Sequence, residues 1–174
     1  MTSPYSGIFT SRSSDSPIGR IEVSASNAGL IGVGLFGHHL AAGTLAGPSL
    51  ENDHSRQTLV QILEYLNGKR KTFDATIDWS GVTAFHRTVL AEAMKIGFSE
   101  VLTYGQLAAV LGKPAASRAI GGAMARNPMP IIIPCHRVVA ADGRLTGYSA
   151  ADGIATKRFL LELEGRKVVG EKLA

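Results

Sequence analysis

The chain has little of what marks several protein classes. Its 174 residues include one cysteine, Cys135, which excludes an intramolecular disulfide and a cysteine-rich zinc site. No run approaches the roughly 18 consecutive apolar residues that a membrane helix needs. The starting residues MTSPYSGIFTSRSSDSPIG lack the apolar stretch of a secretory signal. We therefore expect a cytoplasmic protein, or a nuclear one in a eukaryote, without a membrane partner.

Acidic residues are missing from one region, since none occurs between Glu100 and Asp142. Four basic residues fall in this gap: Lys113, Arg118, Arg126 and Arg137. Residues 1–80 hold 6 Lys and Arg against 7 Asp and Glu, a balance of −1, whereas residues 81–174 hold 12 against 7, a balance of +5. A one-sided cationic surface suits a polyanion such as nucleic acid, and a slightly basic solvated face is the alternative.

The composition is sufficient for a hydrophobic core, because 45% of the residues are hydrophobic and only 18% are charged. The pattern changes at Ser80-Gly81, the best candidate for a domain boundary. Before it, alternating apolar residues predict strands over residues 18–25, 30–36 and 72–79, and a helical stripe predicts a helix over residues 55–66. Residues 37–50 are rich in glycine and receive no assignment.

Beyond the boundary the pattern is helical. Helices are expected over residues 82–97, 103–111, 115–125 and 155–163. Thr103 and Gln106 form a capping box at the start of the second of these. The sequence therefore predicts an α+β protein. A small N-terminal sheet-and-helix module (residues 1–80) precedes a mainly helical C-terminal domain (residues 81–174) with a helix-turn-helix and an active-site loop.

The helix-turn-helix candidate has an unusual second helix. The Gly112-Lys113-Pro114 break separates two short helices, as in units that present their second helix to DNA. Gly121 and Gly122 lie inside that second helix, where each glycine costs about 1 kcal/mol of helix stability. Close approach of another backbone would explain them, and that backbone belongs either to DNA or to a neighbouring helix of the protein itself.

Cys135 is the candidate nucleophile. A lone cysteine is most often a buried and inert residue, but His136 and Arg137 follow it, and two nearby cations favour the thiolate. A thiolate attacks soft electrophiles such as alkyl carbons. Either the backbone bends at Pro134-Cys135 or His136 reaches the sulfur through a water. Spacing alone does not choose the acid that orients His136 among Asp142, Asp152, Glu162 and Glu164.

The segment MPIIIPCHRVVAADGRLTGYS, together with SRAIGGAMARNP before it, closely resembles the methylated-DNA–protein-cysteine methyltransferases, also called O6-alkylguanine-DNA alkyltransferases. The strong similarity covers about Phe85–Gly165. The resemblance implies a single-turnover repair protein that binds the minor groove of duplex DNA containing alkylated guanine. It flips the damaged nucleotide, transfers the alkyl group to its cysteine and needs no metal or cofactor. We expect a monomer, with cooperative binding on DNA and activity on O4-alkylthymine left open.

The resemblance also assigns roles residue by residue. Cys135 would accept the alkyl group, His136 would act as the base through a water, and Glu164 would orient His136. Tyr104 would lie beside the flipped nucleotide and give a proton to the guanine ring. Asn127 would brace the turn that leads to the active-site segment.

Further residues would contact the DNA and the flipped base. Arg118 would enter the duplex and fill the gap left by that base. The other DNA-contacting residues would be Tyr104, Ala119, Gly121, Gly122 and Ala123. The pocket would be lined by Met124, Val138, Tyr148 and Ser149, with the Val138 carbonyl facing the base amine. The loop after Tyr148 is about two residues longer than the family pattern and contains Asp152, which leaves the accepted alkyl sizes open.

Two other functions remain as alternatives. A binding module would recognise alkylated or distorted DNA without repairing it, but relatives of that kind lack the acceptor cysteine. A cysteine hydrolase of small esters or amides would turn over repeatedly, but it would leave the basic helix unexplained.

Overall fold

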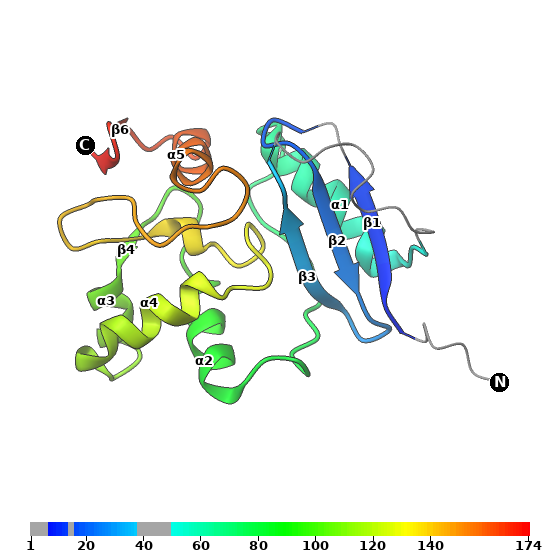
Figure 1. Ribbon diagram of the computed structural model, residues 1–174, viewed down its shortest axis with the longest axis horizontal. Helices are drawn as coiled ribbons and strands as arrows, with labels where there is room; N and C mark the ends of the chain where they lie inside the picture. Colours follow the sequence, from blue (N-terminus) through cyan, green and yellow to red (C-terminus); the bar gives the residue numbers. More distant parts are fainter. Residues whose placement is uncertain (1–6, 14–15, 38–49) are drawn as a thin grey trace. The chain divides into compact units, whose positions relative to one another are not determined.

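The computed structural model describes residues 7–13, 16–37 and 50–174. The chain divides into two compact units, Met1–Gly81 and Val82–Ala174. The α+β architecture predicted from the sequence is confirmed, with a small antiparallel sheet in the first unit and a mainly helical second unit (Figure 1). In the described parts of the chain, no helix is long and apolar enough to cross a membrane.

The sheet of the first unit has three antiparallel strands in the order β1-β2-β3. They are β1 (Phe9–Ser13), β2 (Ile21–Ala25) and β3 (Leu30–Leu35). Strand β2 buries every second residue, as expected for a sheet with one covered face. The β2–β3 hairpin is confirmed, and its turn is closed by the Ser26 N–H donating to the Gly29 carbonyl at 2.8 Å.

Helix α1 (Asp53–Leu66) packs on this sheet and buries Leu59, Ile62 and Tyr65. It begins two residues before the predicted start at Ser55. The reason is a capping box, in which the Asn52 side chain accepts from the Ser55 N–H at 2.9 Å and the Ser55 hydroxyl accepts from the Asn52 N–H at 3.2 Å.

The prediction of a strand over residues 72–79 is wrong. Only an isolated bridge between Leu30 and Ile77 forms there. The Leu30 N–H donates to the Thr76 carbonyl at 2.8 Å and the Asp78 N–H donates to the Leu30 carbonyl at 2.9 Å. The alternating side chains suit a strand, but the backbone meets β3 only at its first residue. Residues 37–50 received no assignment from the sequence, and residues 38–49 of that segment lie outside the described residues.

The second unit is built around four α-helices. They are α2 (Ala84–Ala93), α3 (Tyr104–Val110), α4 (Ser117–Ala125) and α5 (Ile154–Leu163). Helix α2 is shorter than the predicted 82–97. It starts after its cap, Thr83, and beyond Ala93 the chain turns more tightly, with the Lys95 N–H bonded to the Glu92 carbonyl and the Ile96 N–H to the Ala93 carbonyl.

The predicted helix-turn-helix consists of α3, the 3₁₀ turn η1 (Pro114–Ala116) and α4. The capping box of α3 is confirmed, with the Thr103 hydroxyl accepting from the Gln106 N–H at 3.1 Å and the Gln106 carbonyl accepting from the Thr103 N–H at 2.7 Å. Helix α4 packs on α3 and α2, and its Ile120 is completely buried.

Two pairs of short strands complete the second unit. Strand β4 (Leu102–Thr103) pairs in parallel with β5 (Val138–Val139), which directly follows the 3₁₀ turn η2 (Cys135–Arg137). Strands β6 (Val168–Val169) and β7 (Lys172–Leu173) form a second pair that the sequence analysis did not anticipate. A buried cluster ties β5 to α5 and β6: Val139, Leu145, Leu161 and Val168.

Candidate active site

Cys135 lies at the start of a tight turn. The Cys135 N–H donates to the Ile133 carbonyl at 2.8 Å, and the Arg137 N–H donates to the Pro134 carbonyl at 2.9 Å. The backbone therefore bends at Pro134-Cys135, which was one of the two arrangements open from sequence. The residue is 6% exposed, so its sulfur is almost enclosed by protein.

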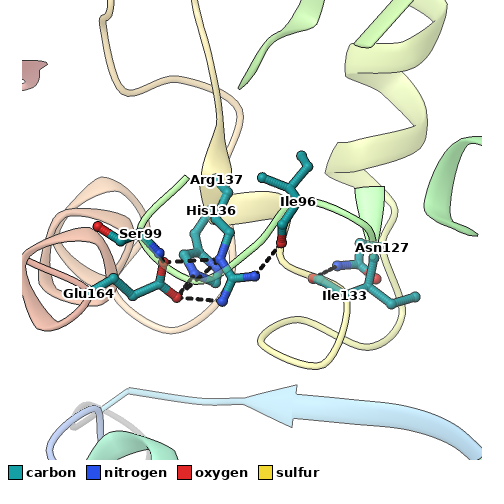
Figure 2. A network of polar contacts seen from close by, with 7 residues as sticks. All are labelled: Ile96, Ser99, Asn127, Ile133, His136, Arg137 and Glu164. Carbon is teal, nitrogen blue, oxygen red and sulfur yellow. Dashed lines mark hydrogen bonds and ion pairs between the residues drawn. The ribbon is translucent and has the colours of Figure 1, made fainter. Parts of the chain in front are cut away.

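The His136 side chain points to Glu164 at the end of α5 (Figure 2). The distance between His136 Nε2 and Glu164 Oε1 is 3.0 Å, and both side chains are fully buried. The structure thus selects Glu164 among the four acids that spacing left open. A carboxylate at Nε2 favours the tautomer with its proton on Nε2, which leaves the lone pair of Nδ1 for accepting a proton.

Arg137 binds the same carboxylate. Its Nη2 lies 2.7 Å from Glu164 Oε1 and its Nε lies 3.0 Å from Oε2, while its Nη1 donates to the Ile96 carbonyl at 2.6 Å. The Ser99 N–H donates to Glu164 Oε2 at 3.1 Å. Figure 2 shows this network around Glu164. The roles of Arg137 and Ser99 could not be predicted from the sequence, because their contacts with Glu164 span 27 and 65 residues of chain.

Electrostatics at the sulfur differ from the sequence prediction. His136 and Arg137 were expected to hold Cys135 as a thiolate. Instead, burial raises the pKa of the Cys135 thiol, and a hydrogen bond from Asn127 and the charge of Lys157 oppose this rise only in part. The carboxylate of Glu164 balances the positive charge of Arg137. Burial lowers the pKa of His136, so its imidazole is uncharged at neutral pH. The resting state is a thiol beside a neutral base.

Asn127 links the end of α4 to the active-site turn. Its Nδ2 donates to the Ile133 carbonyl at 2.8 Å, and its Oδ1 accepts from the Met129 N–H at 3.0 Å. Asn127 thus joins the end of α4 to the active-site turn, and its bracing role stays a prediction.

Asn127→Ala is expected to lower the free energy of unfolding by about 1–3 kcal/mol, since it leaves the Ile133 carbonyl and the Met129 N–H without their partner. Urea unfolding measures the change. The control is Asn67→Ala, because Asn67 makes an exposed bond to the Leu63 carbonyl and its loss should matter less. Equal destabilisation by the two variants would contradict the bracing role.

A small cavity of about 30 Å³ opens beside Cys135. It is lined by Met124, Ala125, Asn127, Pro130, Cys135, Gly147, Tyr148, Ser149 and Ala150. This volume holds about one water molecule. Among the described residues, the buried Tyr148 hydroxyl has no hydrogen-bond partner, which is uncommon for a buried polar group. Of the predicted pocket residues, Val138 is completely buried outside this lining, and its carbonyl accepts from Lys157 Nζ at 2.6 Å.

A wider groove of about 520 Å³ lies along the helix-turn-helix. Its lining includes Tyr104, Arg118, Gly121 and Gly147, and Gly147 also belongs to the cavity of Cys135. The Tyr104 hydroxyl donates to the Thr146 carbonyl at 3.2 Å, and burial raises its pKa. A Cβ on Gly147 would lie 2.5 Å from this hydroxyl, so the close approach requires glycine.

The predicted DNA-contacting residues of α4 divide between two faces. Arg118 and Ala119 are exposed, and Gly121 and Gly122 are half-buried. A Cβ on Gly121 would lie 3.9 Å from the Tyr104 ring, an ordinary contact, so tight helix packing does not explain this glycine. The assignment of Ala123 is corrected, since its side chain is completely buried on the core face of α4 and cannot touch DNA.

Fold and site together define an α+β protein with a helix-turn-helix near a cysteine, which is followed in the chain by a histidine bonded to a buried glutamate. Among the residues that the structure describes, no three His, Cys, Asp or Glu side chains gather as a metal site. Two family models match the chain: 6-O-methylguanine DNA methyltransferase, DNA binding domain, over residues 84–166, and 6-O-methylguanine DNA methyltransferase, ribonuclease-like domain, over residues 10–79. The chain belongs to the 6-O-methylguanine DNA methyltransferase family.

Individual relatives agree with this assignment. The methylated-DNA–protein-cysteine methyltransferase of Methanosarcina acetivorans is 46% identical over 110 residues, which cover 63% of this chain and 69% of the relative. The Homo sapiens protein of that name is 37% identical over 175 residues, covering 88% of this chain and 79% of the relative. The crystal structure of Mycobacterium tuberculosis OGT in complex with DNA has a TM-score of 0.74 at 35% identity, covering 90% of this chain and 91% of that chain.

Proposed function

We propose that this protein repairs duplex DNA by transferring the alkyl group of O6-alkylguanine irreversibly to Cys135. The observation that carries the proposal is the Cys135–His136–Glu164 arrangement, in which a base backed by a carboxylate follows a cysteine at the wall of a cavity. Family membership supports the same reaction. The thioether product is stable, so each molecule acts once.

The transfer needs two proton movements. The Cys135 proton passes through a water to His136 Nδ1, and the resulting thiolate attacks the alkyl carbon. The carbon–sulfur bond forms as the carbon–O6 bond breaks, and the electron pair stays on the guanine. Tyr104, whose raised pKa keeps it protonated at neutral pH, gives a proton to the guanine ring. Glu164 stabilises the imidazolium that forms.

The reacting base must enter a pocket that is nearly closed. A volume of about 30 Å³ is too small for a purine, so entry requires the wall formed by residues 147–150 to move outward. Gly147 has a φ of +68°, which glycine adopts without strain. The flipped base would supply the hydrogen-bond partner that the buried Tyr148 hydroxyl lacks. Extrusion costs a few kcal/mol, and weak pairing of alkylguanine lowers that cost.

Binding would use the minor groove, with α4 as the recognition helix. Arg118 at its start is exposed, lines the groove shared with Tyr104 and would fill the space left by the flipped base. The balance of +5 over residues 81–174 would attract the phosphates, so affinity should fall as salt rises. Sequence selectivity should be weak, because the minor groove distinguishes little beyond A·T and G·C. Residues 1–80 would act as a supporting module.

The proposal is tested by counting repaired bases per protein molecule. The protein is mixed with a severalfold excess of duplex DNA that carries O6-methylguanine, and loss of the lesion is followed by digestion and chromatography. We expect repair to stop at one lesion per protein molecule. No repair by folded protein contradicts the proposed function, and continued turnover contradicts the irreversible transfer. A duplex with O4-methylthymine tests the second substrate under the same conditions.

Arg118→Ala is expected to slow repair of duplex DNA by at least about tenfold, because no side chain then fills the space that the extruded base leaves. Reaction with the free base O6-methylguanine should change little, because that reaction requires no extrusion. The control is Arg126→Ala, which removes a neighbouring exposed arginine that does not line the groove. Equal losses of reaction rate with the duplex and with the free base would contradict the role of Arg118 in base extrusion.

A further inference from the structure

The C-terminal hairpin β6–β7 pairs with the segment that leads into the Cys135 cavity. Besides its pairing with β6, strand β7 pairs with residues 143–145. The Leu145 N–H donates to the Glu171 carbonyl at 2.8 Å, and the Leu173 N–H donates to the Gly143 carbonyl at 3.0 Å. The three segments therefore form one small antiparallel ladder.

This ladder has one buried and one exposed face. Its apolar side chains pack with Val139 and Leu161 in the buried cluster: Leu145, Val168 and Leu173. Because side chains alternate along a strand, the neighbours of these residues point away from the cluster. On the exposed face, Arg144 lies directly opposite Lys172. The outward face of the ladder is therefore basic.

Two positive charges in this position are unfavourable by themselves. Like charges directly opposite each other on neighbouring strands destabilise a sheet. Asp142 balances only Arg144, with 2.6 Å between Asp142 Oδ2 and Arg144 Nε. In the part of the chain that the structure describes, no carboxylate, that of the neighbouring Glu171 included, forms an ion pair with Lys172. One charge of the pair therefore has no anionic partner among these residues.

Lys172 lies beside the groove that would receive DNA. A Cβ on Gly143 would lie 3.6 Å from Lys172 Cγ and 3.7 Å from its Cε, so this side chain runs along the Asp142-Gly143 turn. Ala140 and Ala141, directly before the turn, line the groove together with Arg118. The basic face of the ladder thus continues the surface that borders the groove.

We propose that the basic face of the C-terminal hairpin, with Lys172 at its centre, binds the phosphate backbone of the duplex beyond the groove that holds the lesion. This inference rests on the proposed binding of DNA along α4. A phosphate at Lys172 supplies the anion that the Arg144–Lys172 pair lacks. Phosphate contacts carry no sequence information, so the hairpin adds affinity and fixes the orientation of the protein on the duplex.

The salt dependence of binding counts this contact. Each phosphate neutralised by a lysine contributes about 0.9 to the slope of log affinity against log salt concentration. We therefore expect Lys172→Met to lower the magnitude of this slope by about 0.9 on an undamaged, fluorescently labelled duplex, measured by anisotropy over a series of NaCl concentrations. At about 0.1 M NaCl its affinity should be roughly five- to tenfold weaker. Lys172→Arg should keep the parental slope.

The matched control is Lys69→Met, which removes an exposed lysine of the first unit and should keep the parental slope. A Lys172→Met slope equal to that of the parent, or an equal loss in Lys69→Met, would overturn the proposal. Because binding of undamaged duplex needs no alkyl transfer, a lowered slope together with absent repair would count against the proposed function and leave the hairpin contact standing.

Urea unfolding tests the like-charge pair in the same variant. The free energy of unfolding should not fall in Lys172→Met, because the substitution removes a repulsion between exposed side chains. A fall would contradict the argument that the Arg144–Lys172 pair is retained for an external anion.

A second measurement uses the parent protein and so does not depend on how the variants fold. Lysines are acetylated with an N-hydroxysuccinimide ester in the presence and absence of undamaged duplex, and peptide mass spectrometry follows each site. The duplex should slow acetylation of Lys172 severalfold and leave Lys69 unaffected. Equal acetylation of Lys172 with and without DNA would overturn the proposal.

Discussion

Replacing Cys135 by serine is expected to abolish alkyl transfer while binding to duplex DNA persists. A hydroxyl ionises far less readily than a thiol, and the neutral His136 cannot compensate for that difference. Removal of the nucleophile in other covalent enzymes lowers the rate by at least on the order of a thousandfold. Repair of O6-methylguanine duplex and a mobility shift with the same duplex measure the two properties.

The variant also separates the alternative functions. If the parent transfers no alkyl group and both proteins bind alkylated DNA equally, the chain is a recognition module. If the parent hydrolyses an activated ester repeatedly, it is a cysteine hydrolase. Transfer by Cys135→Ser at the parental rate would contradict the assignment of the acceptor, because no other cysteine exists in the chain.

Replacing Glu164 by glutamine is expected to damage both stability and chemistry. Arg137 keeps its charge in a nearly closed environment, with 7% of its side chain exposed, and loses its counter-ion. Removing one partner of a buried ion pair costs about 3–5 kcal/mol. The weakened hold on His136 should also slow transfer on the order of a hundredfold, a typical contribution of a positioned base. Urea unfolding and single-turnover repair measure these effects, and DNA affinity should stay close to that of the parent.

Glu162→Gln is the matched control on the same helix. Glu162 pairs with Arg158 at 2.9 Å, but 42% of its side chain is exposed, and such pairs contribute about 0–1 kcal/mol. Little change is expected in that variant. A Glu164→Gln protein that unfolds like the parent would contradict the structural importance of the Arg137–Glu164 pair. Normal transfer in that variant would contradict the orienting role.

Local chemistry made much of the fold predictable. The Thr103 capping box and the turn at Ser26–Gly29 depend on residues close in sequence, and both formed where expected. Strand β1 escaped notice because its buried residue is Ser11, which bonds to the Ser55 hydroxyl at 2.9 Å and so lies inside without being apolar. Alternation at residues 72–79 predicted a strand, but pairing along a strand depends on the partner backbone, which sequence periodicity does not report.

The sequence predicted the central residues of the candidate site, Cys135 and His136, but not which residues surround them. The PCHR motif identified Cys135 and His136, but four acids were equally compatible by spacing, and only the packing of α5 brings Glu164 to His136. The sequence neighbours of Cys135 suggested a stabilised thiolate, and burial reversed this direction. Lys157 was overlooked because a lysine in a helix is usually solvated, whereas here its stem crosses to two distant carbonyls.

Intact mass spectrometry of the protein after incubation with O6-methylguanine duplex shows whether Cys135 accepts the methyl group. We expect the mass to rise by one methyl group in place of one hydrogen, fragmentation to place the methyl group on Cys135, and Cys135→Ser to stay unmodified. A folded protein of unchanged mass that has bound the duplex, or a methyl group on any other residue, would contradict the assignment of Cys135 as the acceptor.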